Sequence, residues 1–368
     1  MIRLEARPRP SWWAALASPV IALVLTLLTG CLLLLAFGKD PIKGLYYLFI
    51  DPITVWWSLE EVLVKATPLA LIAAGLSVCF RANVWNIGAE GQFIVGAIAG
   101  SALPVVLPEV QGPHVLPLML LCGTLGGALF ALIPALLRVR FGANEILVSL
   151  MLVYVAELFL DWLVRGPWRN PAGFNFPETR QFHEWATMPI VGDSRLNIGI
   201  FIAIACCAVL AFVLSRTYFG FGVRLSGTAP RAARFAGISR NRTILLVMAL
   251  SGGLAGLAGI MEVAGPIGQL RIQISPGYGF TAIIVAFLAR LNPVGAIAAA
   301  FVLSVTYIGG EAAQIAIGIS DKITRVFQGA LLFFVLGSDV LIRYRITWTR
   351  RTPVIQTPEP AAVERTST

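Results

Sequence analysis

Long apolar stretches separated by short polar segments recur along almost the whole chain. We count ten candidate spans, because a helix rises 1.5 Å per residue and needs about 20 apolar residues to cross a hydrocarbon layer about 30 Å thick. They are Leu16–Phe37, Leu59–Cys79, Ile87–Leu107, Val115–Leu137, Glu145–Val164, Leu196–Leu214, Thr243–Gly265, Gly279–Leu291, Val294–Gly310 and Ile323–Ile342. The eighth is short, and Pro293 with the restricted residue before it favours a turn between the eighth and the ninth. The pattern predicts an all-α, polytopic membrane protein with about ten transmembrane helices.

Composition supports this fold class and indicates where the transmembrane domain begins and ends. The chain is 57% hydrophobic and 13% charged, whereas soluble domains average about 25% charged residues. We expect a transmembrane domain over residues 16–342, after a short amino-terminal segment, residues 1–15. The tail, residues 343–368, is rich in Pro, Thr and Glu towards its end, and we expect it to be disordered.

The positive charges indicate how the helices are oriented. With the amino terminus inside, the inner segments carry about twice as many lysines and arginines as the outer ones, as the positive-inside rule requires. Both termini are then cytoplasmic. This placement at the ends of the spans also explains the net charge of +9 better than binding to nucleic acid does.

One inner segment, residues 215–242, carries six arginines and no acidic residue. We call it the coupling segment. Its middle, residues 227–237, predicts a short helix with a basic face and a small apolar face. Arg231, Arg234, Phe235 and Gly237 are the residues expected to dock on a partner protein. The alternative is a solvated loop whose arginines only set the orientation of the spans.

A second polar segment, Phe80–Gln92, lies between two apolar spans and reads FRANVWNIGAEGQ. Polar groups at membrane depth persist only where they line a cavity or pair within the protein. We expect a broken or re-entrant helix here, with Asn83, Asn86, Glu90 and Gln92 beside a substrate path. An ordinary cytoplasmic turn capped by Asn86 and Glu90 explains the same residues equally well.

Other polar residues of the spans are weaker candidates. Asn144 and Glu145 open the fifth span and are assigned to the path, although a helix cap with an acid in the first turn accounts for both. Glu157, Asp161 and Glu262 are intramembrane acids, each a functional candidate or the partner of an arginine.

Two outer segments invite a functional interpretation. Gln269, Gln273 and Tyr278 lie in a Gly/Pro-rich outer connection that forms either a gate or a plain loop. The long outer loop, residues 165–195, combines charges with Trp168, Phe174, Phe176 and Trp185. We expect it to receive an external protein, unless it is a lid packed on the outer surface of the chain itself.

Small residues recur at the spacing that lets helices approach closely in lipid. The pairs are Gly96/Gly100, Gly123/Gly127 and Gly252/Gly256. All five cysteines lie in apolar stretches without a CxxC motif, so we expect neither disulfides nor metal ligands.

Several motifs are absent from the sequence. There is no GxxxxGK[ST] loop, no HExxH and no GxSxG, and these are the motifs that would mark a nucleotide site, a zinc protease or a serine hydrolase. We expect the chain not to be an enzyme, and to hold no metal or cofactor of its own.

The motifs together resemble a known family. Phe80–Gln92, Asn144–Leu163, Arg165–Trp168 and Gly279–Pro293 are similar to stretches of the permease subunits of bacterial ABC importers. The similarity is to the nucleoside and simple-sugar branch of the branched-chain amino acid/ribose permease family, and it covers roughly residues 68–337. Ala89 and Arg290 depart slightly from that branch.

The resemblance implies partners and a location. Such permeases work in the bacterial inner membrane as a pair, here a heterodimer, with cytoplasmic subunits that bind ATP and an external substrate-binding lipoprotein. It implies that residues 227–237 dock on the ATPase. An ion-coupled secondary transporter, or a membrane-embedded enzyme or scaffold, are the competing interpretations.

The candidate path residues are mostly neutral hydrogen-bonding groups, which suit a neutral polar solute better than a phosphate. The resemblance narrows that solute to a nucleoside or a related simple sugar or purine. Branched-chain amino acids are the alternative cargo.

Overall fold

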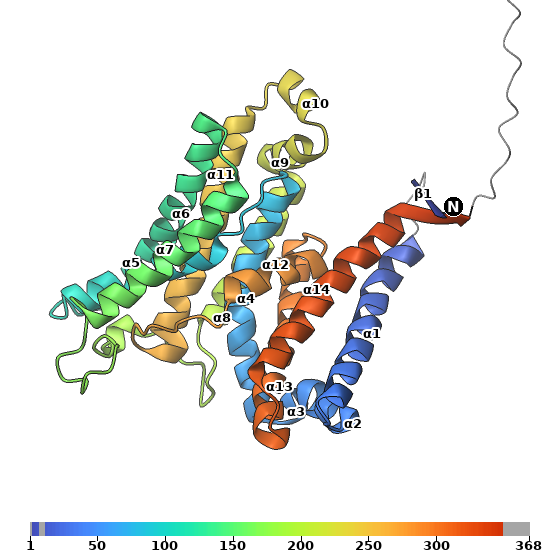
Figure 1. Cartoon of the computed structure of the whole chain (residues 1–368). Helices are drawn as coiled ribbons and strands as arrows, with labels where there is room; N and C mark the ends of the chain where they lie inside the picture. Colours follow the sequence, from blue (N-terminus) through green and yellow to red (C-terminus); the bar gives the residue numbers. More distant parts are fainter. Residues whose placement is uncertain (1, 7–11, 349–368) are drawn as a thin grey trace, which may run out of the picture.

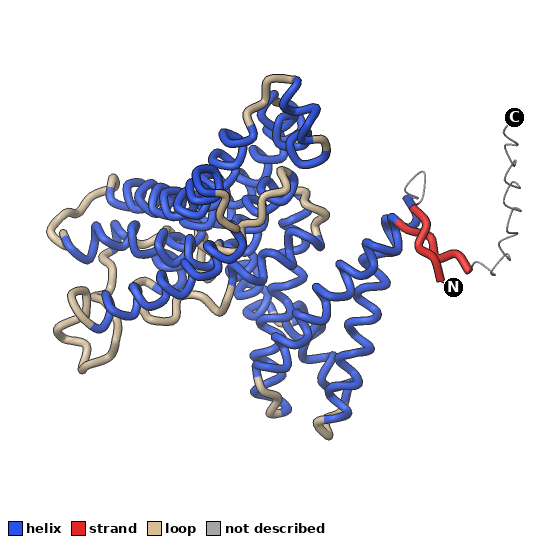
Figure 2. Tube along the Cα trace, turned by 45° about the horizontal axis from the view of Figure 1, so that its top comes forward, coloured by secondary structure: helices blue, strands red, loops and turns tan. Residues whose placement is uncertain are grey.

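The computed structural model describes residues 2–6 and 12–348 as a bundle of helices with one pair of short strands at its edge (Figures 1 and 2). Its elements are β1 (Ile2–Ala6), α1 (Trp12–Ala36), α2 (Pro41–Leu45), η1 (Tyr46–Ile50), α3 (Asp51–Thr54), α4 (Trp56–Arg81), α5 (Ala89–Val106), α6 (Val115–Phe141), α7 (Glu145–Arg165), η2 (Glu184–Ala186), α8 (Gly199–Arg216), α9 (Tyr218–Thr228), α10 (Pro230–Phe235), α11 (Arg240–Glu262), η3 (Val263–Ile267), α12 (Tyr278–Leu288), α13 (Pro293–Ile317), α14 (Asp321–Arg343) and β2 (Tyr344–Trp348). The helical fold class predicted from the sequence is confirmed.

Each predicted span coincides with one helix, but not every one of these helices is a full crossing. In the described part of the chain, seven helices are long and apolar enough to cross a membrane: α4, α5, α6, α7, α8, α11 together with η3, and α13. The other three predicted spans coincide with α1, α12 and α14, of which α12 has only 11 residues. The structure thus supports seven of the ten predicted crossings by length and composition.

Helix α12 departs most clearly from the prediction. It has 11 residues and is about 17 Å long, roughly half of the hydrocarbon thickness. It ends in a turn in which Arg290 and Leu291 both have positive φ, 54° and 58°. The apolar run Gly279–Leu291, the short eighth span of the prediction, therefore forms a half-length helix and the turn that is favoured before Pro293.

Close glycine contacts join α5, α6 and α11 on one side of the bundle (Figure 1). A Cβ added to Gly96 would lie 2.1 Å from the Cα of Gly256, and one added to Gly127 would lie 2.3 Å from the carbonyl oxygen of Gly252. A Cβ at Gly256 would meet the carbonyl of Gly123 at 2.3 Å. The predicted role of these glycines in helix packing is confirmed, because no larger residue fits.

Helix α4 is the central element and packs against α8, α11, α12 and α13. Its residues from Thr67 to Phe80 are all buried. At one edge of the bundle, α1 and α14 lie side by side (Figure 1). Strand β1 precedes α1 and β2 follows α14, and the two strands pair in antiparallel register with Ile2 opposite Trp348.

The segments predicted to be cytoplasmic gather at one end of the bundle, which we call the α10 end. There the Nε of Arg81 donates a hydrogen bond of 2.8 Å to the carbonyl of Leu291, and Gly227 packs on the carbonyl of Arg81. At the opposite end, the Nζ of Lys39 donates to the carbonyl of Ile317 at 2.6 Å. The arrangement agrees with the predicted alternation, while the side of the membrane stays a prediction.

Both predicted terminal segments contribute a strand. Ile2–Ala6 lies in the amino-terminal segment, and Tyr344–Trp348 lies at the start of the predicted tail. Residues 1, 7–11 and 349–368, which include most of that tail, lie outside the described residues.

The predicted orientation can be tested with two single cysteines in a variant lacking the five native ones. Thr228 at the α10 end and Asn175 in the outer loop are both exposed. An impermeant thiol reagent added to intact cells should modify Asn175→Cys and leave Thr228→Cys unmodified until the cells are opened. The reverse pattern would contradict the orientation.

Candidate functional site

The segment between α4 and α5 turns back into the bundle instead of ending at its surface. Residues 82–88 form no helix, and Asn86 is fully buried. The side-chain amide of Asn86 donates a hydrogen bond of 3.1 Å to the hydroxyl of Ser251. Ser251 lies about 17 Å along α11 from the first residue of that helix. Helix α5 therefore starts inside the protein, as expected for a re-entrant segment.

Helix α12 also begins inside the protein, but its chain arrives from the opposite end. Residues 268–277 lead inward from Gly268, whose φ of 74° places it in the left-handed region. The hydroxyl of Ser275 accepts hydrogen bonds from the backbone N–H groups of Gly277 and Tyr278, at 3.0 and 2.9 Å. These bonds satisfy donors that a helix start otherwise leaves unpaired.

The starts of α5 and α12 meet at Glu90. Its carboxylate accepts a hydrogen bond of 2.5 Å from the backbone N–H of Gly279, and the side chain is buried. A Cβ on Gly279 would lie 2.2 Å from the backbone nitrogen of Glu90, so only glycine permits this approach. A carboxylate at a helix amino terminus is stabilised by the helix dipole and pairs with a free N–H group.

A polar cavity of about 610 Å³ lies beside this junction. Its lining residues come from α4, α5, α7, α11, η3, α12, α14 and the inward connection, residues 268–277. They are Lys65, Glu90, Glu157, Glu262, Ile267, Gln273, Ile274, Ser275, Pro276, Gly277, Tyr278, Phe280 and Arg325. Within it, the phenol of Tyr278 donates a hydrogen bond of 3.2 Å to the carboxylate of Glu262.

The charges of this cavity correct the sequence-based picture of a mostly neutral path. Three acids and two bases line it: Glu90, Glu157, Glu262, Lys65 and Arg325. Positive and negative groups are thus nearly balanced, and hydroxyl and amide groups lie between them. The sequence pattern gave a different impression because these residues are isolated along the chain and converge only in space.

Of the predicted path residues, Glu90 is the one that lines the cavity. Asn86 and Gln92 instead form a closed pair, in which each side-chain amide donates to the carbonyl oxygen of the other at 2.8 Å. Both are buried. The pair joins residues 82–88 to α5 and, through Ser251, to α11. It holds the start of α5 in place.

The remaining predicted path residues lie at the α10 end. The side chain of Asn144 accepts a hydrogen bond of 3.0 Å from the N–H of Ile146 and caps α7. Glu145 forms an ion pair with Arg138. Asn83 has a positive φ of 56°. None of Asn83, Asn144 and Glu145 lines the cavity, and the cap that the sequence offered as an alternative accounts for Asn144.

Sequence reasoning did not assign Lys65, Ser275 or Arg325 to the site. The signal for two of them was available, because a charged side chain within an apolar stretch marks a functional candidate. Lys65 lies in the second predicted span and Arg325 in the tenth. Ser275 carried no comparable signal, since its place depends on how residues 268–277 fold inward.

The coupling segment forms two short helices, α9 and α10, that project from the bundle (Figure 1). Phe235 is 94% exposed at the end of α10, and Arg231 and Arg234 are exposed on the same helix. Gly237, with φ 74°, ends the helix by donating its N–H to the carbonyl of Arg234 at 3.1 Å. The end of α10 thus exposes a large aromatic side chain, Phe235, next to two arginines.

The outer loop packs partly on the bundle's own surface. The N–H groups of Phe182 and Met188 donate to the carbonyls of Gly268 and Ala264, at 2.9 and 2.8 Å. Its tip is different, because Phe174 is 93% exposed. The loop therefore covers the connection that leads to the cavity and presents an aromatic tip to the outside. Its role in receiving an external protein stays a prediction.

Comparison with known proteins identifies the class to which this fold and site belong. The sequence matches the family described as the branched-chain amino acid transport system, permease component, over residues 58–336. The chain belongs to this family. It is an ABC transporter permease and a multi-pass membrane protein.

Named relatives add detail. The chain is 36% identical to the glucose ABC transporter permease protein TsgB13 of Haloferax volcanii, over 94% of this chain and 93% of the relative. It is 30% identical to the nucleoside ABC transporter permease protein NupB of Lactococcus lactis, covering 86% and 89%. The guanosine ABC transporter permease protein NupP of Bacillus subtilis is 29% identical, covering 87% and 92%. Lactococcus lactis has a second relative of the chain, NupC, and Bacillus subtilis has a second one, NupQ.

The junction at Gly279 can be tested by adding one methyl group. Gly279→Ala forces the backbones of α5 and α12 apart, and such overpacking costs about 1–3 kcal/mol. We expect a lower melting temperature for the purified protein in detergent. Gly222→Ala is the matched control, because its Cβ would only touch Ile238 at 3.7 Å and alanine favours a helix. Equal melting temperatures for both variants would contradict the close junction.

Proposed function

We propose that this permease moves nucleosides or related simple sugars and purines into the cell, driven by ATP hydrolysis in a separate subunit. The observation that carries the proposal is the polar cavity at the start of α12, in a chain whose relatives are named as glucose, nucleoside and guanosine permeases. The chain itself would hold no cofactor, and ATP would be bound by its partner.

The cavity has groups that suit a neutral, polyhydroxylated solute. Its carboxylates accept hydrogen bonds from hydroxyl groups, while Lys65 donates to ring and carbonyl oxygens. Gln273 and Ser275 add neutral groups of both kinds. A volume of about 610 Å³ lies within the range of about 300–1,000 Å³ typical of small-molecule sites. A phosphate is disfavoured, because three acids face the same space.

A branched-chain amino acid is the second candidate cargo, and one observation favours it. The cavity presents charges of both signs, which complement the ammonium and carboxylate groups of a zwitterion. The description of the family points the same way. The names of the similar relatives favour the nucleoside or sugar.

Ion-coupled transport is the weaker mechanism for this chain. Two of the acids in the cavity, Glu90 and Glu262, already accept hydrogen bonds from Gly279 and Tyr278. An ATP-driven mechanism requires no coupling ion. It does require a surface through which the ATPase acts, and α10 with its exposed Phe235 supplies one.

Three kinds of partner complete the proposed importer. ATP-binding subunits would dock at the α10 end, and a substrate-binding protein would deliver the solute at the opposite end, where the outer loop presents its aromatic tip. A second, similar permease would complete the pore. The paired permeases named in Lactococcus lactis and Bacillus subtilis support a heterodimer.

Uptake measurements separate the cargoes. A strain lacking the permease, and the same strain carrying it again, should be compared for uptake of labelled adenosine, uridine, glucose, ribose and leucine. We expect nucleoside or sugar uptake to fall on deletion and to return on complementation, with leucine uptake unchanged. Loss of leucine uptake alone would establish the second candidate and contradict the first.

A further inference from the structure

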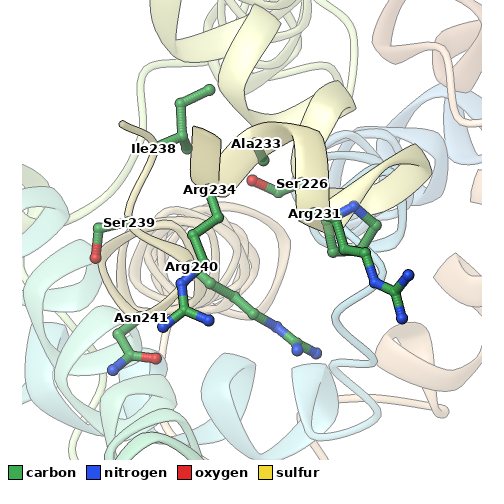
Figure 3. A pocket seen from close by; sticks show the side chains of 9 residues that line it. Ser226, Arg231, Ala233, Arg234, Ile238, Ser239, Arg240 and Asn241 are labelled. Carbon is green, nitrogen blue, oxygen red and sulfur yellow. The ribbon is translucent and has the colours of Figure 1, made fainter. Parts of the chain in front are cut away.

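A second hollow, of about 470 Å³, lies beside the coupling helix α10 (Figure 3). The end of α9, helix α10 and the start of α11 surround it. Its lining residues are Ser226, Pro230, Arg231, Ala233, Arg234, Ile238, Ser239, Arg240 and Asn241. The prediction from sequence concerned what the exposed face of α10 inserts into a partner, whereas this hollow concerns what the chain can receive.

The hollow carries uncompensated positive charge. Figure 3 shows Arg234, from α10, and Arg240, from the start of α11, both extending downward in the view, while Arg231 lies to their right. The ion pairs found among the described residues involve Arg138, Arg165, Arg195 and Arg271, and thus none of these three. The coupling segment contains no acid that could neutralise them.

Hydrogen-bond donors add to this charge. Helix α11 begins at Arg240 with 23 residues, so the positive end of its dipole lies at the wall of the hollow, and the N-cap Ser239 accepts a hydrogen bond from the N–H of Arg242. Ser226 also lines the hollow, and its buried hydroxyl has no hydrogen-bond partner among the residues that the structure describes. Cations and donors of this kind favour an oxyanion as the occupant.

The position of the hollow indicates where the oxyanion comes from. Phe235, 94% exposed, lies on the same short helix as Arg234, and an aromatic side chain surrounded by cations is typical of a protein interface. A partner that covers Phe235 lies next to Arg231 and Arg234, which line the hollow and belong to the same short helix. Charge complementarity then requires acidic residues on that partner.

We propose that the hollow receives an acidic side chain of the ATPase subunit, so that the two proteins interlock in both directions. Phe235 enters the ATPase, and a carboxylate of the ATPase enters the permease between Arg234 and Arg240. This inference rests on the proposed function, because it requires an ATPase partner at the α10 end.

The test measures binding of the purified ATPase subunit to the full-length permease in detergent, over a series of salt concentrations. Arg240→Gln should weaken binding about tenfold and flatten its salt dependence, since one close charge pair is lost. Phe235→Ala should weaken binding while leaving the salt dependence as steep as in the wild type. Arg224→Gln is the matched control, because Arg224 is exposed on α9 and does not line the hollow.

Each other outcome overturns the inference in a distinguishable way. If Arg240→Gln binds the ATPase like Arg224→Gln, the hollow receives nothing from it, although the proposed function stands. If, in addition, inorganic phosphate or vesicles with anionic lipid raise the melting temperature of the wild type but not of Arg240→Gln, the hollow is a site for that small anion or headgroup. If the wild type binds no ATPase, both the inference and the proposed function fail.

Discussion

The structure depends on how the backbone N–H groups at the starts of two helices find hydrogen-bond partners inside a membrane protein. Backbone N–H groups that find no partner in lipid cost several kcal/mol each, so α12 cannot begin at depth without one. Glu90 provides the partner by accepting from Gly279, and Ser275 provides another for Tyr278. The same junction leaves room for a cavity, because the two segments that turn back inside the bundle, residues 82–88 and 268–277, leave a gap between their polar ends.

The surrounding helices hold this junction and connect it to the coupling segment. The glycine contacts of α5, α6 and α11 fix the helix that carries Glu90. From the α10 end, Gly227 packs on Arg81, and Arg81 donates to the carbonyl of Leu291 just after α12. Since α12 starts at the cavity, a displacement of the coupling segment has a short and continuous route of contacts to the solute site.

The sequence predicted the fold well where apolar length and glycine spacing decide it. Seven predicted spans meet the requirements for crossing, and the paired glycines are where the helices touch. It predicted a span over the short apolar run Gly279–Leu291 and favoured a turn before Pro293, and the structure has a half-length helix that ends in a turn at Arg290 and Leu291. A run of apolar residues shows that a segment is buried, but not how far it extends as a helix.

The site was predicted in part, for a related reason. Glu90 could be found because it stands beside glycines in a polar stretch between spans. Asn86 and Gln92 looked equivalent to it, yet they satisfy each other, and pairing of that kind is invisible in sequence. Lys65 and Arg325 lie far apart along the chain and meet the cavity only through the packing of α4 and α14.

The central claim is that the cavity at the start of α12 lies on the path of the solute. Gln273 lines this cavity, and Phe201, exposed on α8, faces away from the bundle. Gln273→Cys in a cysteine-free variant should react with a small hydrophilic thiol reagent, and the transported solute should slow that reaction. Phe201→Cys should react slowly, with no effect of the solute. Reaction of Gln273→Cys at the same rate with and without saturating solute, in a protein that still transports, would contradict the account.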